Sequence, residues 1–118
     1  MRVLVVDDSA PVRERVAGRL RDAGLDVVGV ADNTPAAVAM VRQLRPDAIV
    51  LDVLLRDRHG LDVLSALRCE APRAFIVILT NAPHYRRHCI DLGADHVLDK
   101  SADFDEVALL LRAAPPQP

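Results

Sequence analysis

The stretch RVLVVDDSAP, residues 2–11, shows the unit from which the chain is built. Residues 2–6 form a short continuous run of valine and leucine behind one arginine, which is typical of a strand buried on both faces. The run stops at Asp7 and Asp8. Ser9 then offers a helix cap, with a proline in the first helical turn. The stretch therefore predicts a strand that leads through two acids into a helix.

The same pattern recurs four more times along the chain. An apolar stripe marks the first helix, and Gly24 and Pro46 are natural ends for the first and second. Strands are expected at residues 2–6, 26–31, 48–51, 74–79 and 96–98; helices are expected after Ser9, after a Thr34–Pro35 cap, and at residues 61–69, 83–92 and 103–113.

Strict alternation of strands and helices predicts one fold class. It favours an α/β fold with a five-stranded parallel sheet, helices on both faces and right-handed crossovers. For five strands the commonest arrangement is the flavodoxin-like order 2-1-3-4-5. We expect a single domain over residues 1–112, followed by an extended proline-rich tail at 113–118. That tail is either a natural end or the start of a linker to an output domain.

Composition excludes several classes of protein. Hydrophobic residues make up 51% of the 118 residues and aromatic residues only 3%, so the core must be aliphatic. A net charge of −2 provides no field for nucleic acid or an anionic membrane. Neither a signal peptide nor a membrane span is visible. Cys69 and Cys89 lack a C-x-x-C spacing; one disulfide is possible, but reduced thiols are favoured, with Cys89 packed inward. We expect a soluble cytoplasmic protein.

Residues whose side chains can bind an ion or take part in a reaction follow four of the five predicted strands. Because the carboxyl ends of parallel strands meet at one edge of the sheet, we expect these residues to gather near the switch point between strands 1 and 3. They are Asp7 and Asp8 after the first strand, Asp52 after the third, Thr80 after the fourth, and Lys100, the only lysine, after the fifth.

This set of side chains suits phosphoryl transfer. Three neighbouring carboxylates repel one another unless a cation joins them, and Mg²⁺ prefers such oxygen ligands. Asp52 is the candidate nucleophile, since a carboxylate can form an aspartyl-phosphate. Mg²⁺, the Lys100 ammonium and the Thr80 hydroxyl could each serve one phosphoryl oxygen. Taken singly, these residues are ordinary turn, cap or surface residues; their coincidence at four strand ends favours a site.

At this point the motifs resemble the receiver domain of two-component response regulators, over nearly the whole chain. VLVVDDS, IVLDVLLRDRHGLDVL, VILTN and LDKS are similar to that family's acidic, phosphoacceptor, threonine and lysine motifs, and the final third resembles stand-alone receivers. The resemblance implies that Asp52 is the phosphoacceptor, that Mg²⁺ is held by Asp7, Asp8, Asp52 and the backbone carbonyl of Leu54, and that Thr80 and Lys100 bind the phosphoryl group.

The resemblance also implies partners. A sensor histidine kinase would phosphorylate the chain, which would then act through a target protein or pass the group to a histidine phosphotransferase. The fourth helix, fifth strand and fifth helix would form the contact surface of a monomer or weak homodimer. The chain would catalyse only its own phosphorylation and dephosphorylation.

Two rival functions remain open. The first is a receiver-like scaffold that is never phosphorylated. The second is an aspartate-nucleophile phosphatase of the haloacid dehalogenase type, although that family uses a D-x-D motif where this chain has adjacent aspartates.

Four positions depart from the family pattern. Arg56 and Ser101 stand where prolines are usual, and Asn81 replaces a smaller residue. Val97 occupies the position of the aromatic switch residue, three before Lys100. We therefore expect phosphorylation to be transmitted by backbone shifts after Thr80 and in the fourth helix, without an aromatic flip.

Overall fold

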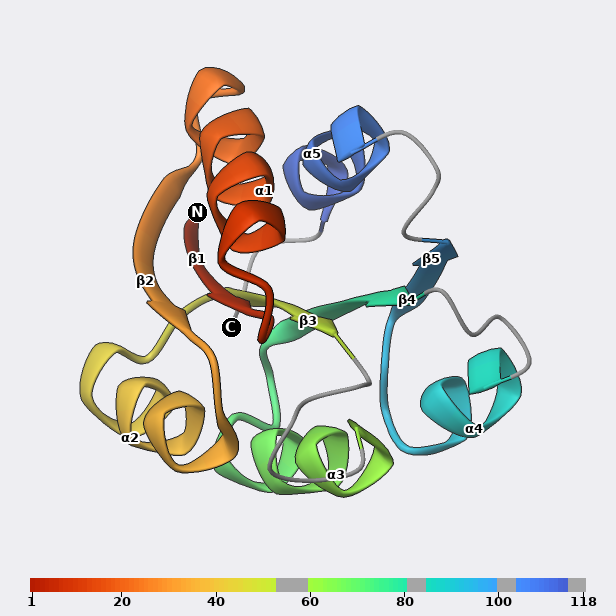
Figure 1. The fold of residues 1–118 in the computed structure, drawn as a ribbon. Coiled ribbons are helices and arrows are strands. Elements are labelled where there is room, and N and C mark those ends of the chain that lie inside the picture. The colour runs from red at the N-terminus through yellow and green to blue at the C-terminus, as the bar shows by residue number, and fades with distance from the viewer. Residues whose placement is uncertain (53–59, 81–84, 100–103, 115–118) are drawn as a thin grey trace.

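In the part of the chain that the structure describes, five strands and five helices alternate, as the sequence predicts (Figure 1). The computed structural model describes residues 1–52, 60–80, 85–99 and 104–114. The strands are β1 (Arg2–Val6), β2 (Asp26–Ala31), β3 (Ala48–Asp52), β4 (Phe75–Thr80) and β5 (His96–Asp99). The helices are α1 (Ala10–Asp22), α2 (Thr34–Leu44), α3 (Gly60–Glu70), α4 (Arg86–Asp91) and α5 (Phe104–Ala113).

The strands form one parallel sheet in the order β2-β1-β3-β4-β5, which confirms the predicted fold class. Helices α1 and α5 cover one face of this sheet, and α2, α3 and α4 cover the other (Figure 1). The first and third strands are neighbours in the middle of the sheet. Their carboxyl ends therefore meet at the point where strand order reverses.

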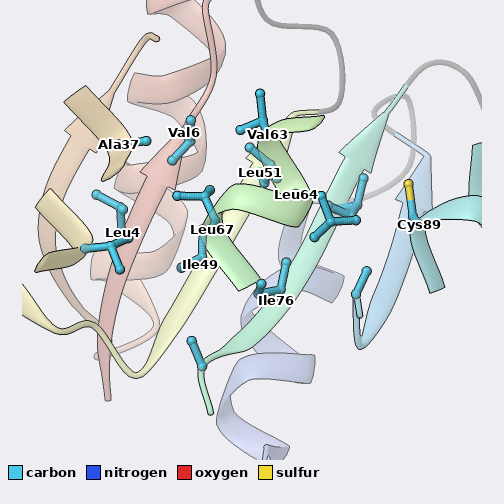
Figure 2. Close-up of a cluster of buried hydrophobic side chains, with 14 of the residues drawn as sticks. Leu4, Val6, Ala37, Ile49, Leu51, Val63, Leu64, Leu67, Ile76 and Cys89 are labelled. Carbon is cyan, nitrogen blue, oxygen red and sulfur yellow. The ribbon is translucent and has the colours of Figure 1, made fainter. Parts of the chain in front are cut away.

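Each central strand contributes side chains to two separate cores, because successive residues point to opposite faces. Val3 and Val5 of β1 pack beneath α1 and α5, whereas Leu4 and Val6 pack against the helices of the other face (Figure 2). All four are at most 1% exposed. Cys89, also in the second cluster, is buried, and both cysteines are free. The expectations of an aliphatic core and an inward Cys89 are confirmed.

The helix caps agree with the sequence at α1 and differ at α2. The Ser9 hydroxyl accepts from the Val12 N–H at 3.5 Å, as expected. The predicted cap at Thr34 is wrong: Asn33 is the cap, and its side-chain oxygen accepts from the Ala36 N–H at 2.9 Å. Asn33 has an extended backbone, which places its carboxamide over the first turn, while Thr34 is already helical and buried.

Element ends differ slightly from the prediction. Strands β3, β4 and β5 each run one residue further, to Asp52, Thr80 and Asp99. On α3, the side chains of Val63, Leu64 and Leu67 are buried. Ala113 is the last residue of α5, as the predicted helix over residues 103–113 requires, and is therefore not part of an extended tail; residues 115–118 lie outside the described residues, so the rest of the tail stays a prediction. Among the described residues, no helix combines the length and apolar character that a membrane span requires.

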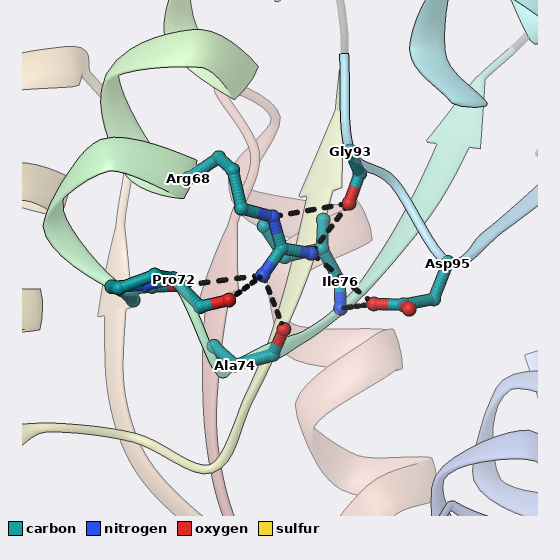
Figure 3. Close-up of polar contacts among 7 residues, drawn as sticks. Arg68, Pro72, Ala74, Ile76, Gly93 and Asp95 are labelled. Carbon is teal, nitrogen blue, oxygen red and sulfur yellow. Dashed lines mark hydrogen bonds and ion pairs between the residues drawn. The ribbon is translucent and has the colours of Figure 1, made fainter. Parts of the chain in front are cut away.

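Arg68 of α3 ties this helix to the starts of β4 and β5 (Figure 3). Its guanidinium donates to the backbone carbonyls of Ala71, Pro72, Ala74 and Gly93, and to the Asp95 carboxylate at 3.2 Å. The same carboxylate accepts from the Ile76 N–H at 2.8 Å. One side chain thus supplies hydrogen bonds to several carbonyls at the amino edge of the sheet, where the strands no longer supply partners.

Candidate functional site

Three carboxylates converge at the carboxyl edge of the sheet. Oxygen atoms of Asp7, Asp8 and Asp52 all lie within 4.8 Å of one another. Asp7 and Asp52 are only 3% and 5% exposed, and Asp8 is half-buried. Their convergence follows from the pairing of β1 with β3, in which Val6 is the register partner of Leu51. Aspartates 45 residues apart in sequence are therefore brought to one point by strand pairing.

Asp7 is positioned by hydrogen bonds from three directions. Its N–H donates to the Ala31 carbonyl at the end of β2, at 3.0 Å. Its carboxylate Oδ1 accepts from the Ser9 N–H at 2.9 Å. Its own carbonyl accepts from Nη1 of Arg13, at 2.8 Å. The loop between β1 and α1 is thus held by the sheet, by its own turn and by the helix that follows.

Sequence reasoning missed Arg13. A usable signal was present, since Arg13 lies in the first turns of a helix that follows the acidic pair directly, and a long side chain there can reach back toward the preceding loop. Arginine is common on helix surfaces, however, so only the structure distinguishes this residue from a solvated one.

Thr80 is the last residue of β4, the strand beside β3, and it is wholly buried. Asp52 is the register partner of Leu79, so Thr80 lies one residue nearer the carboxyl edge than that partner. Across the next pair, Thr80 is opposite Asp99 of β5. Thr80 and the three aspartates therefore belong to the carboxyl ends of three adjacent strands.

The remaining predicted site residues, Leu54 and Lys100, lie outside the described residues, as do Arg56, Asn81 and Ser101. Lys100 directly follows Asp99 in sequence, and Asp99 ends the edge strand β5. Val97, which stands where the family usually has an aromatic switch residue, lies in the described part of the chain. It is 8% exposed and is the register partner of Ile78 of β4. A valine therefore occupies a core position here.

The donor set fits Mg²⁺. It consists of carboxylate oxygens without histidine or cysteine, which suits a hard divalent cation. The three carboxylates each offer an oxygen atom within 4.8 Å of the others, so one ion could contact all three residues. The cation would relieve the repulsion among three largely buried carboxylates.

Comparison with known protein families shows which family has this arrangement of residues. The model of the response regulator receiver domain matches residues 3–112. The chain belongs to the response regulator receiver family. Receiver domains of this family are phosphorylated by histidine kinases and bind Mg²⁺ at an acidic pocket. The resemblance read from the motifs is thereby confirmed.

Relatives carry this receiver domain within longer proteins. The probable transcriptional regulatory protein TcrX of Mycobacterium tuberculosis is 41% identical over 113 residues, which are 94% of this chain and 48% of TcrX. A protein-glutamate methylesterase/protein-glutamine glutaminase of Anaeromyxobacter dehalogenans is 35% identical, over 96% of this chain and 35% of its own length. The chain thus spans about half or less of these bacterial relatives, whose named activities differ.

Solved receiver domains have the same fold. The receiver domain of NarL from Mycobacterium tuberculosis superposes with a TM-score of 0.84 at 29% identity, covering 94% of this chain and 92% of that one. The response regulator domain of CheB from Thermotoga maritima gives 0.83 at 26% identity, covering 95% and 90%. The flavodoxin-like architecture of this receiver domain is therefore shared with these two solved response regulator domains.

Proposed function

We propose that this receiver domain accepts a phosphoryl group from a sensor histidine kinase on the carboxylate of Asp52, with Mg²⁺ as cofactor. The observation that carries the proposal is the convergence of Asp52 with Asp7 and Asp8. Asp52 ends a central strand and is only 5% exposed, so its side chain has little conformational freedom left to lose. A nucleophile held in this way loses little entropy when the phosphoryl donor arrives.

Each residue of the site has a distinct part in the transfer. A carboxylate oxygen of Asp52 attacks phosphorus, and an O–P bond forms as the N–P bond of the donor phosphohistidine breaks. Asp7, Asp8, Asp52 and the Leu54 carbonyl would hold Mg²⁺. When bound, Mg²⁺ supplies charge neutralisation at a phosphoryl oxygen. The Thr80 hydroxyl and the Lys100 ammonium would donate to the other oxygens.

The output is proposed to be contact between proteins. The surface of α4, β5 and α5 would meet a target, or the group would pass onward to a histidine phosphotransferase. Exposed arginines at positions 86 and 87 and an Ile90 that is 42% exposed make α4 suitable for such contact. The chain would work in the cytoplasm as a monomer or weak homodimer, would catalyse only its own phosphorylation and dephosphorylation, and would use residues 1–112 as its receiver domain.

Incubation with acetyl phosphate and Mg²⁺, followed by intact mass measurement, tests the proposal. We expect a gain of one phosphoryl group in the wild type and none in Asp52→Asn or without Mg²⁺. Absence of the gain in folded wild-type protein would favour the scaffold alternative. Turnover of a generic phosphate ester would instead indicate a phosphatase, and we expect no turnover.

A further inference from the structure

Arg13 lies at the junction of the acidic loop and α1. Its backbone N–H donates to the Ser9 carbonyl at 2.9 Å, which closes the first turn of the helix. Its side chain is half-buried and turns back along the chain, where Nη1 donates to the Asp7 carbonyl at 2.8 Å. Among the ion pairs of the described residues, none involves Arg13. The guanidinium of Arg13 therefore bonds to the backbone of Asp7, a residue whose carboxylate belongs to the acidic cluster.

The Asp7 carbonyl belongs to the peptide that joins the first two aspartates of the cluster. β1 ends at Val6, so this peptide lies beyond the last strand residue. The N–H of Asp7 still bonds to Ala31, but that bond fixes the preceding peptide plane. The bond from Arg13 fixes the next plane, and the direction of Asp8 from the main chain depends on that plane.

We propose that Arg13 is a positioning residue of the metal site, which holds the peptide between Asp7 and Asp8 so that both carboxylates face one cation. This inference rests on the proposed function, since it concerns the same Mg²⁺. It adds a residue to the site that binds neither the ion nor the phosphoryl group. A charge-assisted hydrogen bond to a carbonyl is strong enough for this role.

Charge and positioning predict opposite effects when Arg13 is removed. A guanidinium beside a cation site repels the cation, so its loss should tighten Mg²⁺ binding if charge alone mattered. If positioning dominates, removal of the Arg13 side chain leaves the peptide between Asp7 and Asp8 less ordered. Mg²⁺ binding must then order this peptide, which costs entropy and weakens the affinity. The sign of the change in affinity therefore decides between the two.

The test is a Mg²⁺ titration of isotope-labelled protein followed by amide chemical shifts. Arg13→Met should weaken Mg²⁺ binding about fivefold, the equivalent of about 1 kcal/mol. Arg13→Gln, whose side chain is too short to reach the carbonyl, should weaken it similarly. Arg13→Lys keeps a donor and should stay within about twofold of the wild type. Arg21→Met, an exposed arginine of the same helix, is the matched control and should bind as the wild type does.

Equal or tighter Mg²⁺ binding by a folded Arg13→Met or Arg13→Gln variant overturns the inference. So does a lysine variant as weak as the methionine variant, because the retained donor would then have no effect. If Arg13→Met does not fold, the glutamine and lysine variants decide the question between them. Failure of wild-type phosphorylation by acetyl phosphate would refute the proposed function; normal phosphorylation with unchanged Mg²⁺ affinity in the variants would refute only the role of Arg13.

Discussion

Substitution of three glycines by alanine separates the cost of backbone strain from the cost of contact with Arg68. Gly93 has φ +108°, and a Cβ built on it would lie 2.9 Å from Nε and 3.1 Å from Cγ of Arg68. Gly24 also has a positive φ, +85°, but its Cβ would meet no atom within 4 Å. Gly18 lies inside α1, and its Cβ would also meet open space.

The expected magnitudes follow from these surroundings. Gly24→Ala should cost about 1 kcal/mol of unfolding free energy, the strain of a left-handed alanine. Gly93→Ala carries the same strain and also displaces a guanidinium that bonds to several carbonyls and to Asp95 (Figure 3), so it should cost roughly 3 kcal/mol. Gly18→Ala should stabilise the protein by about 0.5–1 kcal/mol, because alanine is the better helix former.

Urea unfolding of the three variants measures these differences. A second arm places Gly93→Ala in an Arg68→Ala background, where its extra cost should fall to the level of Gly24→Ala. If Gly93→Ala is no more destabilising than Gly24→Ala, or if its cost is unchanged without the guanidinium, Arg68 does not constrain this turn and the reasoning is wrong.

Three further predictions follow from the site and the cores. Without Mg²⁺, Asp52→Asn should be more stable than the wild type by about 1 kcal/mol, since it removes a carboxylate from a repulsive cluster. The variant should also gain less stability than the wild type when Mg²⁺ is added. Thermal melts with and without Mg²⁺ check this, and equal stabilisation of both proteins by Mg²⁺ would contradict it. Burial raises the pKa of the Cys89 thiol, so a thiol reagent should label the native protein quickly at Cys69 alone. The free energy of unfolding should fall as pH rises past about 9, because the thiol of the unfolded chain ionises first. Labelling followed by mass measurement, and unfolding at several pH values, test these two expectations; equal labelling rates at the two cysteines would refute the first. Because Val97 replaces the aromatic switch, beryllofluoride should shift amide signals across residues 81–98 without an aromatic rotamer change; unchanged signals there would exclude a backbone signal.

Much of the fold and the gathering of the three carboxylates could be predicted from the sequence, for a simple reason. Short apolar runs interrupted by acids and caps have local physical causes, and parallel strands always bring their carboxyl ends to one edge. Asp7, Asp8 and Asp52 could therefore be expected together before any distance was known. The cap of α2 was misplaced because Asn33 and Thr34 can both cap, and only the backbone angles decide between them.

The sequence by itself determined the alternating α/β fold, the aliphatic core and the residues at the strand ends, because periodicity and turn chemistry are properties of short segments. Only the tertiary structure decided which long side chains turn back onto the backbone. Arg13 reaches the Asp7 carbonyl, and Arg68 reaches Gly93, 25 residues away. Those contacts depend on how the helices pack on the sheet, and sequence position alone, even that of Arg13 just after the acidic pair, is not enough to distinguish these two arginines from solvated ones.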